Sequence, residues 1–217
     1  LYMNSISKDS KFCTLVQFFK TEKAKNPTRI SHPELEVYNS IGDENSLREA
    51  AVLIAITRPT AKIDSHIILT VRSSELKSHA GQISLPGGKS ESIDADAVAT
   101  ALRESEEEIG LASSEVKVIG RLGTLALPSG YLVTPIVGSI NQGIKFVRQA
   151  EEVAAIFQVP LNLVLDVQSY KKSKVDFRGK KRTILELQFQ NYRIWGATAA
   201  ILYNLAIQVS QDKRVVK

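Results

Sequence analysis

Several features are scarce in this chain of 217 residues, and each scarcity narrows what the protein can be. Cys13 is the only cysteine, so no disulfide can form within the chain, which is compatible with a reducing compartment. The longest apolar runs, 50–57 and 132–140, are far shorter than the ~20 residues that a membrane-spanning helix needs. The first residues also show no secretory signal pattern. We therefore expect a cytoplasmic protein with no membrane partner.

Basic residues outnumber acidic ones, but they form no recognisable nucleic-acid motif. The chain has 28 Lys and Arg against 23 Asp and Glu, a formal net charge of +5. Apart from clusters at 20–25 and 178–182, the basic residues are scattered, and no basic helix carries interleaved aromatic residues. We expect no nucleic-acid partner. The charge fits either an anionic small-molecule substrate or a plain solvated surface.

Hydrophobic patterning divides the chain into an N-terminal part, residues 1–47, and a larger domain, residues 48–217. The N-terminal part contains one amphipathic stretch, which predicts a helix over 11–23, followed by a polar, irregular arm over 26–46. In the larger domain, strands and helices mix without strict βαβ alternation, which favours an α+β fold with a mixed sheet. The expected strands are 50–57, 66–72, 116–127, 132–140, 154–159 and 182–195; the expected helices are 94–109, 160–167 and 197–211.

Acidic residues concentrate near the end of the expected helix 94–109. Glu104, Glu107 and Glu108 are spaced i, i+3, i+4, so they form one patch on the helix surface. Their mutual repulsion and the helix dipole both disfavour this arrangement, and a bound divalent cation would relieve it. A solvated acidic face is the alternative. The stripe expected to face the core consists of Val98, Ala101, Leu102, Ser105 and Ile109.

The segment 103–111 resembles the second half of the Nudix box, G-x5-E-x7-R-E-U-x-E-E-x-G-U, where U is a bulky apolar residue. Arg103, the three glutamates and Gly110 fall in register with it. The first half departs from the box. The departures are Ala95 at the box Glu position, flanked by Asp94 and Asp96, Gly88 one residue too far from Arg103, and Ser105 in place of a bulky residue.

The segment 69–88 resembles a pattern that marks Nudix coenzyme A diphosphatases, close to L-T-x-R-S-x3-R-x-H-x-G-Q-I-S-F-P-G-G. Lys77 and Leu85 stand where that pattern has Arg and Phe, and Asp94 falls where the subfamily usually has Asp. Lys77 keeps the charge but lacks the forked contact that Arg makes. Weaker resemblances follow at 129–138, 151–161 and 194–198.

The resemblance implies a Nudix fold, a mixed β-sheet sandwiched between α-helices, and a Nudix pyrophosphatase. The implied reaction is metal-dependent hydrolysis of coenzyme A or its acyl derivatives to 3′,5′-ADP and (acyl-)4′-phosphopantetheine, with Mg²⁺ or Mn²⁺ as cofactor. Two alternatives stay open. One is a Nudix pyrophosphatase acting on another nucleoside diphosphate derivative such as ADP-ribose, and the other is a non-catalytic Nudix-fold binding module. The partner is a small molecule in the first two cases, and a homodimer is compatible with all three.

The resemblance also implies roles for individual residues. The implied metal ligands are Glu104, Glu107 and Glu108, and Arg103 holds their carboxylates in place. The general base is either a box glutamate such as Glu107 or the later Glu152, for which a plain surface position is the alternative. The implied substrate-binding residues are Arg72, Lys77, His79, Gly87 and Gly88; the glycines allow a tight backbone turn toward the helix, and a structural hydrogen bond is the alternative for His79.

Overall fold

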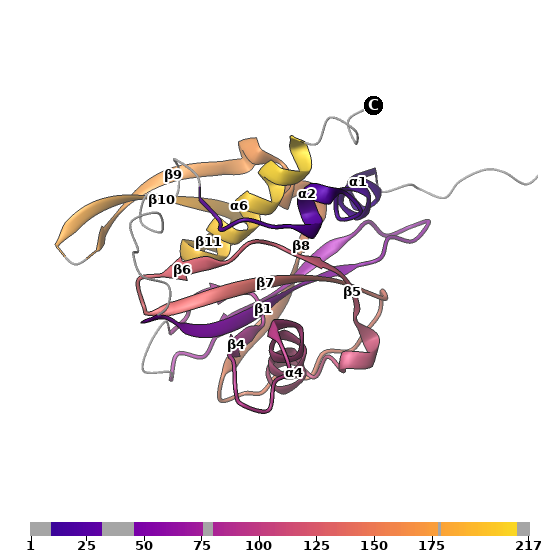
Figure 1. Cartoon of the computed structure of the whole chain (residues 1–217), viewed down its shortest axis with the longest axis horizontal. Helices are drawn as coiled ribbons and strands as arrows, with labels where there is room; N and C mark the ends of the chain where they lie inside the picture. Colours follow the sequence, from indigo (N-terminus) through magenta and orange to yellow (C-terminus); the bar gives the residue numbers. More distant parts are fainter. Residues whose placement is uncertain (1–9, 32–45, 76–79, 178, 212–217) are drawn as a thin grey trace, which may run out of the picture.

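A mixed sheet forms the centre of the molecule (Figure 1). The computed structural model describes residues 10–31, 46–75, 80–177 and 179–211. Within this part of the chain the sheet has eight strands. Its main path runs through β3 (Ile83–Ser84), β2 (His66–Arg72), β1 (Arg48–Thr57), β7 (Tyr131–Ile140) and β5 (Lys117–Arg121); β4 (Gly87–Lys89) pairs with β1, β6 (Leu125–Leu127) with β7, and β8 (Val153–Pro160) with β2.

The two central strands, β1 and β7, run parallel, from the pair Arg48 and Tyr131 to the pair Thr57 and Ile140. The other described pairs in this sheet are antiparallel. The residues of β1 from 50 to 57 are nearly all buried, because helices cover the sheet on both faces. A continuous apolar run in the sequence therefore corresponds to the most deeply buried strand.

Helices form a layer on each face of the sheet (Figure 1). Helix α4 (Ala97–Ile109) covers one face and packs on β1 and β7 through a core that includes Leu53, Ile109 and Ile136. The other face is covered by α6 (Gly196–Ser210), joined by α1 (Ser10–Phe18), α2 (Glu22–Lys25) and α5 (Leu161–Val164). The expected fold class, a mixed sheet between helices, is confirmed. Among the described residues, no helix is both long and apolar enough to cross a membrane.

A second, three-stranded antiparallel sheet lies beside α6 and consists of β9 (Tyr170–Phe177), β10 (Lys180–Phe189) and β11 (Tyr192–Trp195). The prediction of one strand over 182–195 is wrong, because the chain reverses at Gln190, whose φ is +51°. The predicted strand 116–127 is likewise divided into β5 and β6. Short helical turns, η3 (Ser113–Glu115) and η4 (Val167–Ser169), complete the described elements.

The N-terminal segment belongs to the same hydrophobic core as the sheet. The expected helix 11–23 is divided into α1 and α2, since Thr21 accepts a hydrogen bond from the Ala24 N–H and so begins a new helix. Leu15 and Phe18 are fully buried in the core on the α6 side. The Ile30 N–H donates to the carbonyl that precedes β6, at 2.8 Å. Residues 32–45 of the expected arm lie outside the described residues.

Candidate active site

The acidic helix α4 begins and ends at residues whose local chemistry fixes both termini. Asp96 precedes the helix and accepts a hydrogen bond from the Ala99 N–H at 2.8 Å. Gly110 ends it in the left-handed conformation, with φ +65°, and its N–H donates to the Glu106 carbonyl. The predicted end of the helix is confirmed, while the start lies at Ala97 rather than at Asp94.

We expect Gly110→Ala to lower the free energy of unfolding by about 1–2 kcal/mol, since an L side chain is strained at this φ. The new Cβ would also lie 3.2 Å from Val147 backbone and side-chain atoms. Gly143→Ala is the matched control, because Gly143 has φ +81° but no atom within 4 Å of the added Cβ. Urea denaturation measures both. Equal losses in the two variants would show that the Val147 contact contributes nothing.

One carboxylate of the expected patch is not on the surface. Glu108 is 3% exposed and lies on the core side of α4, beside Ser105 and Ile109. Glu107 points outward and its side chain is 60% exposed. The exposed fraction of the Glu104 side chain lies between those of Glu108 and Glu107. Glu108 is therefore buried rather than on the helix surface, while its carboxylate still interacts with that of Glu104. The predicted core stripe holds for Ala101, Ser105 and Ile109, but Val98 and Leu102 are only half-buried.

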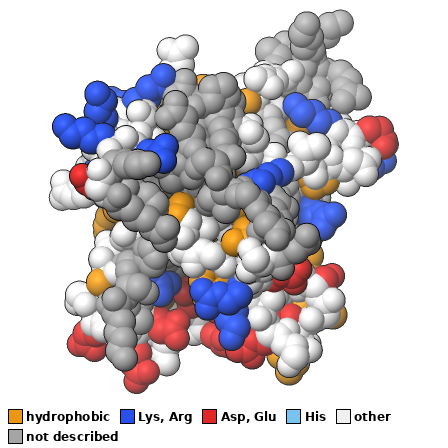
Figure 2. Space-filling model, turned by 60° about the vertical axis from the view of Figure 1, so that its left-hand side comes forward, with side chains coloured by type: hydrophobic (Ala, Val, Ile, Leu, Met, Phe, Trp, Pro, Cys, Tyr) orange, Lys and Arg blue, Asp and Glu red, His pale blue; other side chains and the backbone are white. Residues whose placement is uncertain are grey.

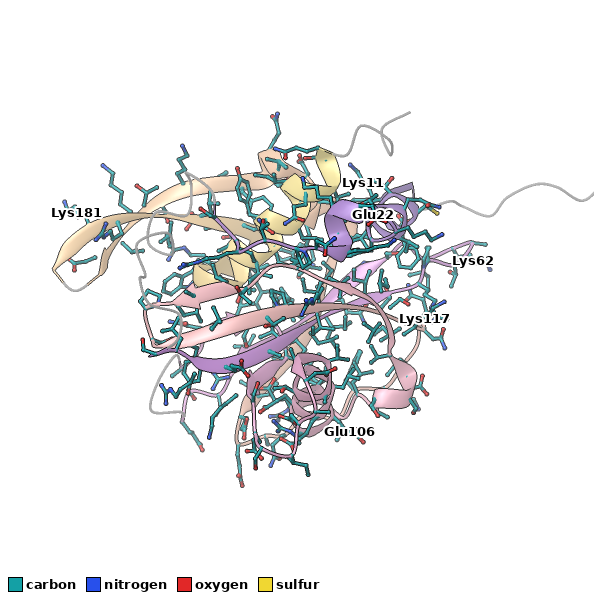
Figure 3. The ribbon with its side chains drawn as sticks, viewed as in Figure 1. Lys11, Glu22, Lys62, Glu106, Lys117 and Lys181 are labelled. Carbon is teal, nitrogen blue, oxygen red and sulfur yellow. The ribbon has the colours of Figure 1, made fainter. Side chains whose placement is uncertain are left out.

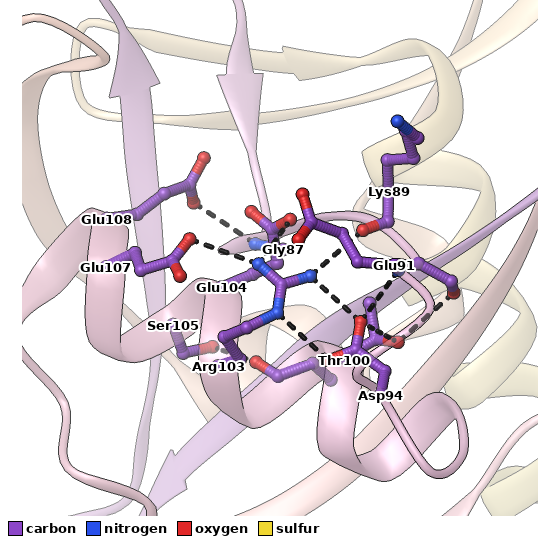
Figure 4. A network of polar contacts seen from close by, with 12 residues as sticks. Gly87, Lys89, Glu91, Asp94, Thr100, Arg103, Glu104, Ser105, Glu107 and Glu108 are labelled. Atoms are coloured by element: carbon purple, nitrogen blue, oxygen red, sulfur yellow. Dashed lines mark hydrogen bonds and ion pairs between the residues drawn. The ribbon is translucent and has the colours of Figure 1, made fainter.

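Arg103 connects the helix to the loop before it (Figure 4). Its Nε and Nη2 donate to the two carboxylate oxygens of Asp94, both at 2.9 Å, and Nη2 also donates to the Lys89 carbonyl at 3.1 Å. Its Nη1 donates to Glu104 at 3.2 Å and to Glu107 at 3.1 Å. Arg103 thus contacts two of the three predicted metal ligands through one nitrogen.

Asp94, for which the sequence predicts no role, is a partner of Arg103 in the structure. The Arg103 guanidinium holds the pKa of the Asp94 carboxyl well below its usual range, helped by the Glu91 N–H and the Thr100 hydroxyl, which also donate to it. The box Glu position is occupied by Ala95, so Asp94 supplies the carboxylate from one residue away. The signal available in the sequence was an Asp beside a missing box glutamate.

Two adjacent glycines bring β4 against the carboxylates. A Cβ on Gly88 would lie 2.4 Å from Glu104 Oε2, so the Glu104 carboxylate occupies space that any other residue at position 88 would fill. Gly87 has φ +146°, and its N–H donates to Glu108 Oε2 at 3.1 Å. Glycine at position 88 therefore leaves room for the Glu104 carboxylate, and glycine at position 87 allows the backbone conformation from which its N–H reaches Glu108.

Burial and like charges change the protonation of this cluster. Burial is the largest cause that raises the pKa of Glu108, which is about 7. The Gly87 N–H and the positive charge of Arg72 act in the opposite direction, while the carboxylates of Glu104 and Glu152 raise the pKa further. Burial also raises the pKa of Glu104, and Glu107 and Glu152 add to that effect. Glu104, Glu108 and Glu152 are therefore near enough to repel one another.

The end of β2 and the start of β8 complete the site. Arg72, on β2, places Nη1 3.7 Å from Glu108 Oε1. The Ser73 N–H donates to the Glu152 carbonyl at 2.8 Å, which fixes Glu152 beside the end of β2. Arg72, Glu152, Gly87 and Gly88, predicted from distant parts of the sequence, are thus brought to the carboxylate helix. Lys77 and His79 lie outside the described residues.

The carboxylates fit a divalent cation in chemistry and charge. Among the described residues, no three acidic, His or Cys side chains are already arranged as an ion-binding group, and Arg103 donates hydrogen bonds to both Glu104 and Glu107. Carboxylate oxygens are nevertheless the ligands that Mg²⁺ and similar hard cations prefer. Burial raises the pKa of Glu104 and Glu108, and the repulsion of neighbouring carboxylates adds to it; a bound cation would offset that repulsion.

Comparison with known proteins places this site in a family. The family model described as NUDIX domain matches residues 47–172, more than half of the chain. Two relatives are named "Uncharacterized Nudix hydrolase NudL". The Photorhabdus laumondii protein is 43% identical over 169 residues, covering 78% of this chain and 88% of the relative. The Yersinia pestis protein is 42% identical over 164 residues, covering 75% of this chain and 80% of the relative.

Among solved structures, the Nudix hydrolase RenU from M. smegmatis aligns with a TM-score of 0.46 at 21% identity, over 55% of this chain and 74% of that chain. The family match and the two relatives assign the family without this structural alignment. They show that the chain belongs to the Nudix family, a family of pyrophosphatases that generally depend on divalent metal ions.

Proposed function

We propose that this protein hydrolyses the pyrophosphate bond of coenzyme A or its acyl derivatives, giving 3′,5′-ADP and (acyl-)4′-phosphopantetheine. The observation that carries the proposal is the segment 69–88, which resembles the coenzyme A diphosphatase pattern. Three of its residues, Arg72, Gly87 and Gly88, lie against the carboxylate helix. The part of the sequence that resembles this subfamily is therefore also the part that lines the acidic cluster.

The proposed metal ligands are Glu104, Glu107 and Glu108, which would hold Mg²⁺ or Mn²⁺. Such an ion would neutralise charge on the pyrophosphate and lower the pKa of the attacking water. Arg103 positions Glu104 and Glu107 through its Nη1, and Asp94 fixes the other edge of the same guanidinium. In this proposal Arg103 acts on the reaction through the carboxylates rather than by touching the substrate.

Arg72 is the proposed phosphate contact within the described part of the chain. Its buried Nε has no hydrogen-bond partner there, and its Nη1 lies beyond hydrogen-bond distance of Glu108. A phosphate oxygen of the substrate would accept hydrogen bonds from this guanidinium, and the positive charge of Arg72 would screen the phosphate from the carboxylates. Lys77 and His79 are further proposed contacts by resemblance alone.

The proposed general base is Glu152 or Glu107. Both are exposed carboxylates, and Glu152 is near enough to Glu104 and Glu108 to raise the pKa of each. The base accepts a proton from water as the water oxygen bonds to one phosphorus and the bridging P–O bond breaks. The leaving phosphate keeps the bonding electrons of that bridge.

We expect coenzyme A and acetyl-coenzyme A to be hydrolysed at least tenfold faster, in kcat/KM, than ADP-ribose, and a chelator to abolish hydrolysis of all three. Product masses identify the bond that is cut. Glu107→Gln serves as the catalytic control and is expected to lower the rate strongly. Equal turnover of ADP-ribose would favour the alternative substrate class, and an unchanged rate in Glu107→Gln would contradict its role. The non-catalytic alternative does not agree with membership of a family of hydrolases.

A further inference from the structure

The hairpin of β9 and β10 carries most of the net positive charge of this protein. The described residues of the two strands include six Lys and Arg against Asp176 and Glu186, a net charge of +4. The formal net charge of the whole chain is +5, so all other residues together carry a net charge of only +1. A charge asymmetry of this size between one element and the rest of the chain indicates an anionic partner.

Strand pairing places these basic side chains on both faces of one ribbon. Lys174 pairs with Thr183 and Lys181 with Asp176, so Lys174 and Lys181 share a face. Lys171 and Arg182 lie on the other face by the same alternation. Basic residues from the two strands, which are separated in the sequence, are therefore brought together on the same ribbon, and sequence patterning alone does not indicate this.

The hairpin extends away from the body of the molecule, past the start of α6, and Lys181 lies near its far end (Figures 1 and 3). Lys171, Lys174 and Lys181 are exposed. Two acidic residues offset part of this charge, since Glu186 lies across the strand pair from Lys171 and Asp176 lies across from Lys181. Glu186 also accepts a 2.6 Å hydrogen bond from Arg193, and Asp176 accepts the Gly179 N–H at 3.0 Å. The six basic residues still outnumber these two carboxylates, so the protruding element keeps a net positive charge.

We propose that this hairpin binds the phosphate backbone of double-stranded DNA without sequence preference. A two-stranded β-ribbon has dimensions that the major groove of B-form DNA admits, and basic side chains on both faces would meet phosphates on both groove walls. This binding is separate from the hydrolysis proposed above, because the hairpin contributes none of the residues of that site.

Two other partners fit the observations less well. A membrane surface favours basic side chains beside an apolar anchor, whereas the exposed large hydrophobic residues among those whose side-chain burial is described, Ile63, Ile93, Val118 and Val147, lie outside the hairpin. A second copy of the chain would offer the acidic side chains gathered along the lower edge of Figure 2. That contact would neutralise the tip of the ribbon but leave its two-sided charge unexplained.

The test is fluorescence anisotropy of the full chain with a labelled 20-base-pair DNA duplex of mixed sequence. With about five phosphate contacts, affinity is expected to fall roughly several-hundredfold between 50 and 200 mM salt. Combined Lys171→Gln, Lys174→Gln and Lys181→Gln should weaken binding at least tenfold and reduce the slope of log affinity against log salt by about 3. The combination Lys62→Gln, Lys117→Gln and Lys145→Gln removes the same charge from other exposed positions and should retain binding.

Four outcomes would overturn the proposal: no duplex binding at 50 mM salt, equal weakening by both triple variants, stronger binding to an RNA duplex, or binding to phosphatidylserine vesicles in its place. Loss of self-association in the hairpin variant by sedimentation, without DNA binding, would assign the surface to a second copy. Coenzyme A hydrolysis, measured in parallel, should be unchanged in the hairpin variant, so failure of either proposal is visible separately.

Discussion

Glu108→Gln is expected to lower kcat/KM for coenzyme A by about a thousandfold. The carboxylate is buried beside the Gly87 N–H and Arg72, and in the proposed mechanism it binds the metal ion. A catalytic ion contributes several kcal/mol to the transition state, and each 1.36 kcal/mol corresponds to a factor of ten in rate. Gln preserves shape and a hydrogen-bond acceptor for the Gly87 N–H but removes the charge that holds a cation.

Glu106→Gln is the matched control, because Glu106 lies on the same helix two residues away but is exposed (Figure 3). Its activity should stay within a factor of two of the unmodified protein. Steady-state kinetics at saturating Mg²⁺ measure both variants. A Glu108→Gln enzyme with more than a tenth of the original kcat/KM would contradict the metal-ligand role of Glu108.

The same substitution should stabilise the protein in chelator at high pH. Burial raises the Glu108 pKa from 4.5 to about 7, so the folded state binds a proton more tightly than the unfolded state. The contribution of Glu108 to the free energy of unfolding is fully present below pH 4.5 and is lost as the pH rises through 7. The loss amounts to at most roughly 3 kcal/mol. Glu108→Gln does not titrate, so it should be more stable than the unmodified protein at pH 8.5 and nearly equal at pH 5. Thermal unfolding with chelator measures this; an equal difference at both pH values would contradict it.

Helix α4 shows which parts of the site local sequence determines. Asp96 and Gly110 fix its ends through contacts within four residues, so the helix and its left-handed terminus were predictable. The burial of Glu108 depends instead on how β4 and β2 pack against the helix. Spacing of i, i+3, i+4 gives positions on the helix surface and contains no information about which neighbour covers them.

The strands, turns and contacts that the sequence did not predict also depend on packing between distant parts of the chain. Strand β9 is rich in lysine and lacks apolar alternation, and it is a strand because β10 pairs with it along its whole length. The turn that separates β10 from β11 has no glycine at its positive-φ position, which is occupied by Gln190. The contact of Asp94 with Arg103 spans nine residues and forms only when the loop folds back on the helix. These features depend on tertiary contacts.

Gly88→Ala is expected to reduce activity with little effect on stability. The added Cβ would lie 2.4 Å from Glu104 Oε2, but that atom is the end of a flexible side chain, and Gly88 does not have the positive φ of its neighbour. The Glu104 carboxylate should therefore move while the backbone stays in place. We expect kcat/KM to fall roughly tenfold to a hundredfold, since a displacement of about 1 Å in a catalytic group has effects of this size. The free energy of unfolding should change by less than about 1 kcal/mol.

Gly87→Ala is expected to affect mainly stability, whereas Gly88→Ala affects mainly activity, although the two residues are adjacent. Here the added Cβ would lie 2.3 Å from the Ala51 carbonyl and 2.5 Å from the Val52 Cα, which are backbone atoms of the central strand. The φ of +146° adds strain for any L side chain. Relief requires β4 to separate from β1, so we expect a loss of roughly 3 kcal/mol or more in stability.

Urea denaturation and coenzyme A hydrolysis, measured on both glycine variants, separate the two effects. If the Glu104 carboxylate needs the space above Gly88, activity falls in Gly88→Ala at nearly full stability. If Gly88→Ala keeps full activity, then Glu104 works equally well from another position, and its proposed place among the metal ligands fails. If Gly87→Ala is as stable as the unmodified protein, β4 is not held against β1 in the way these contacts require.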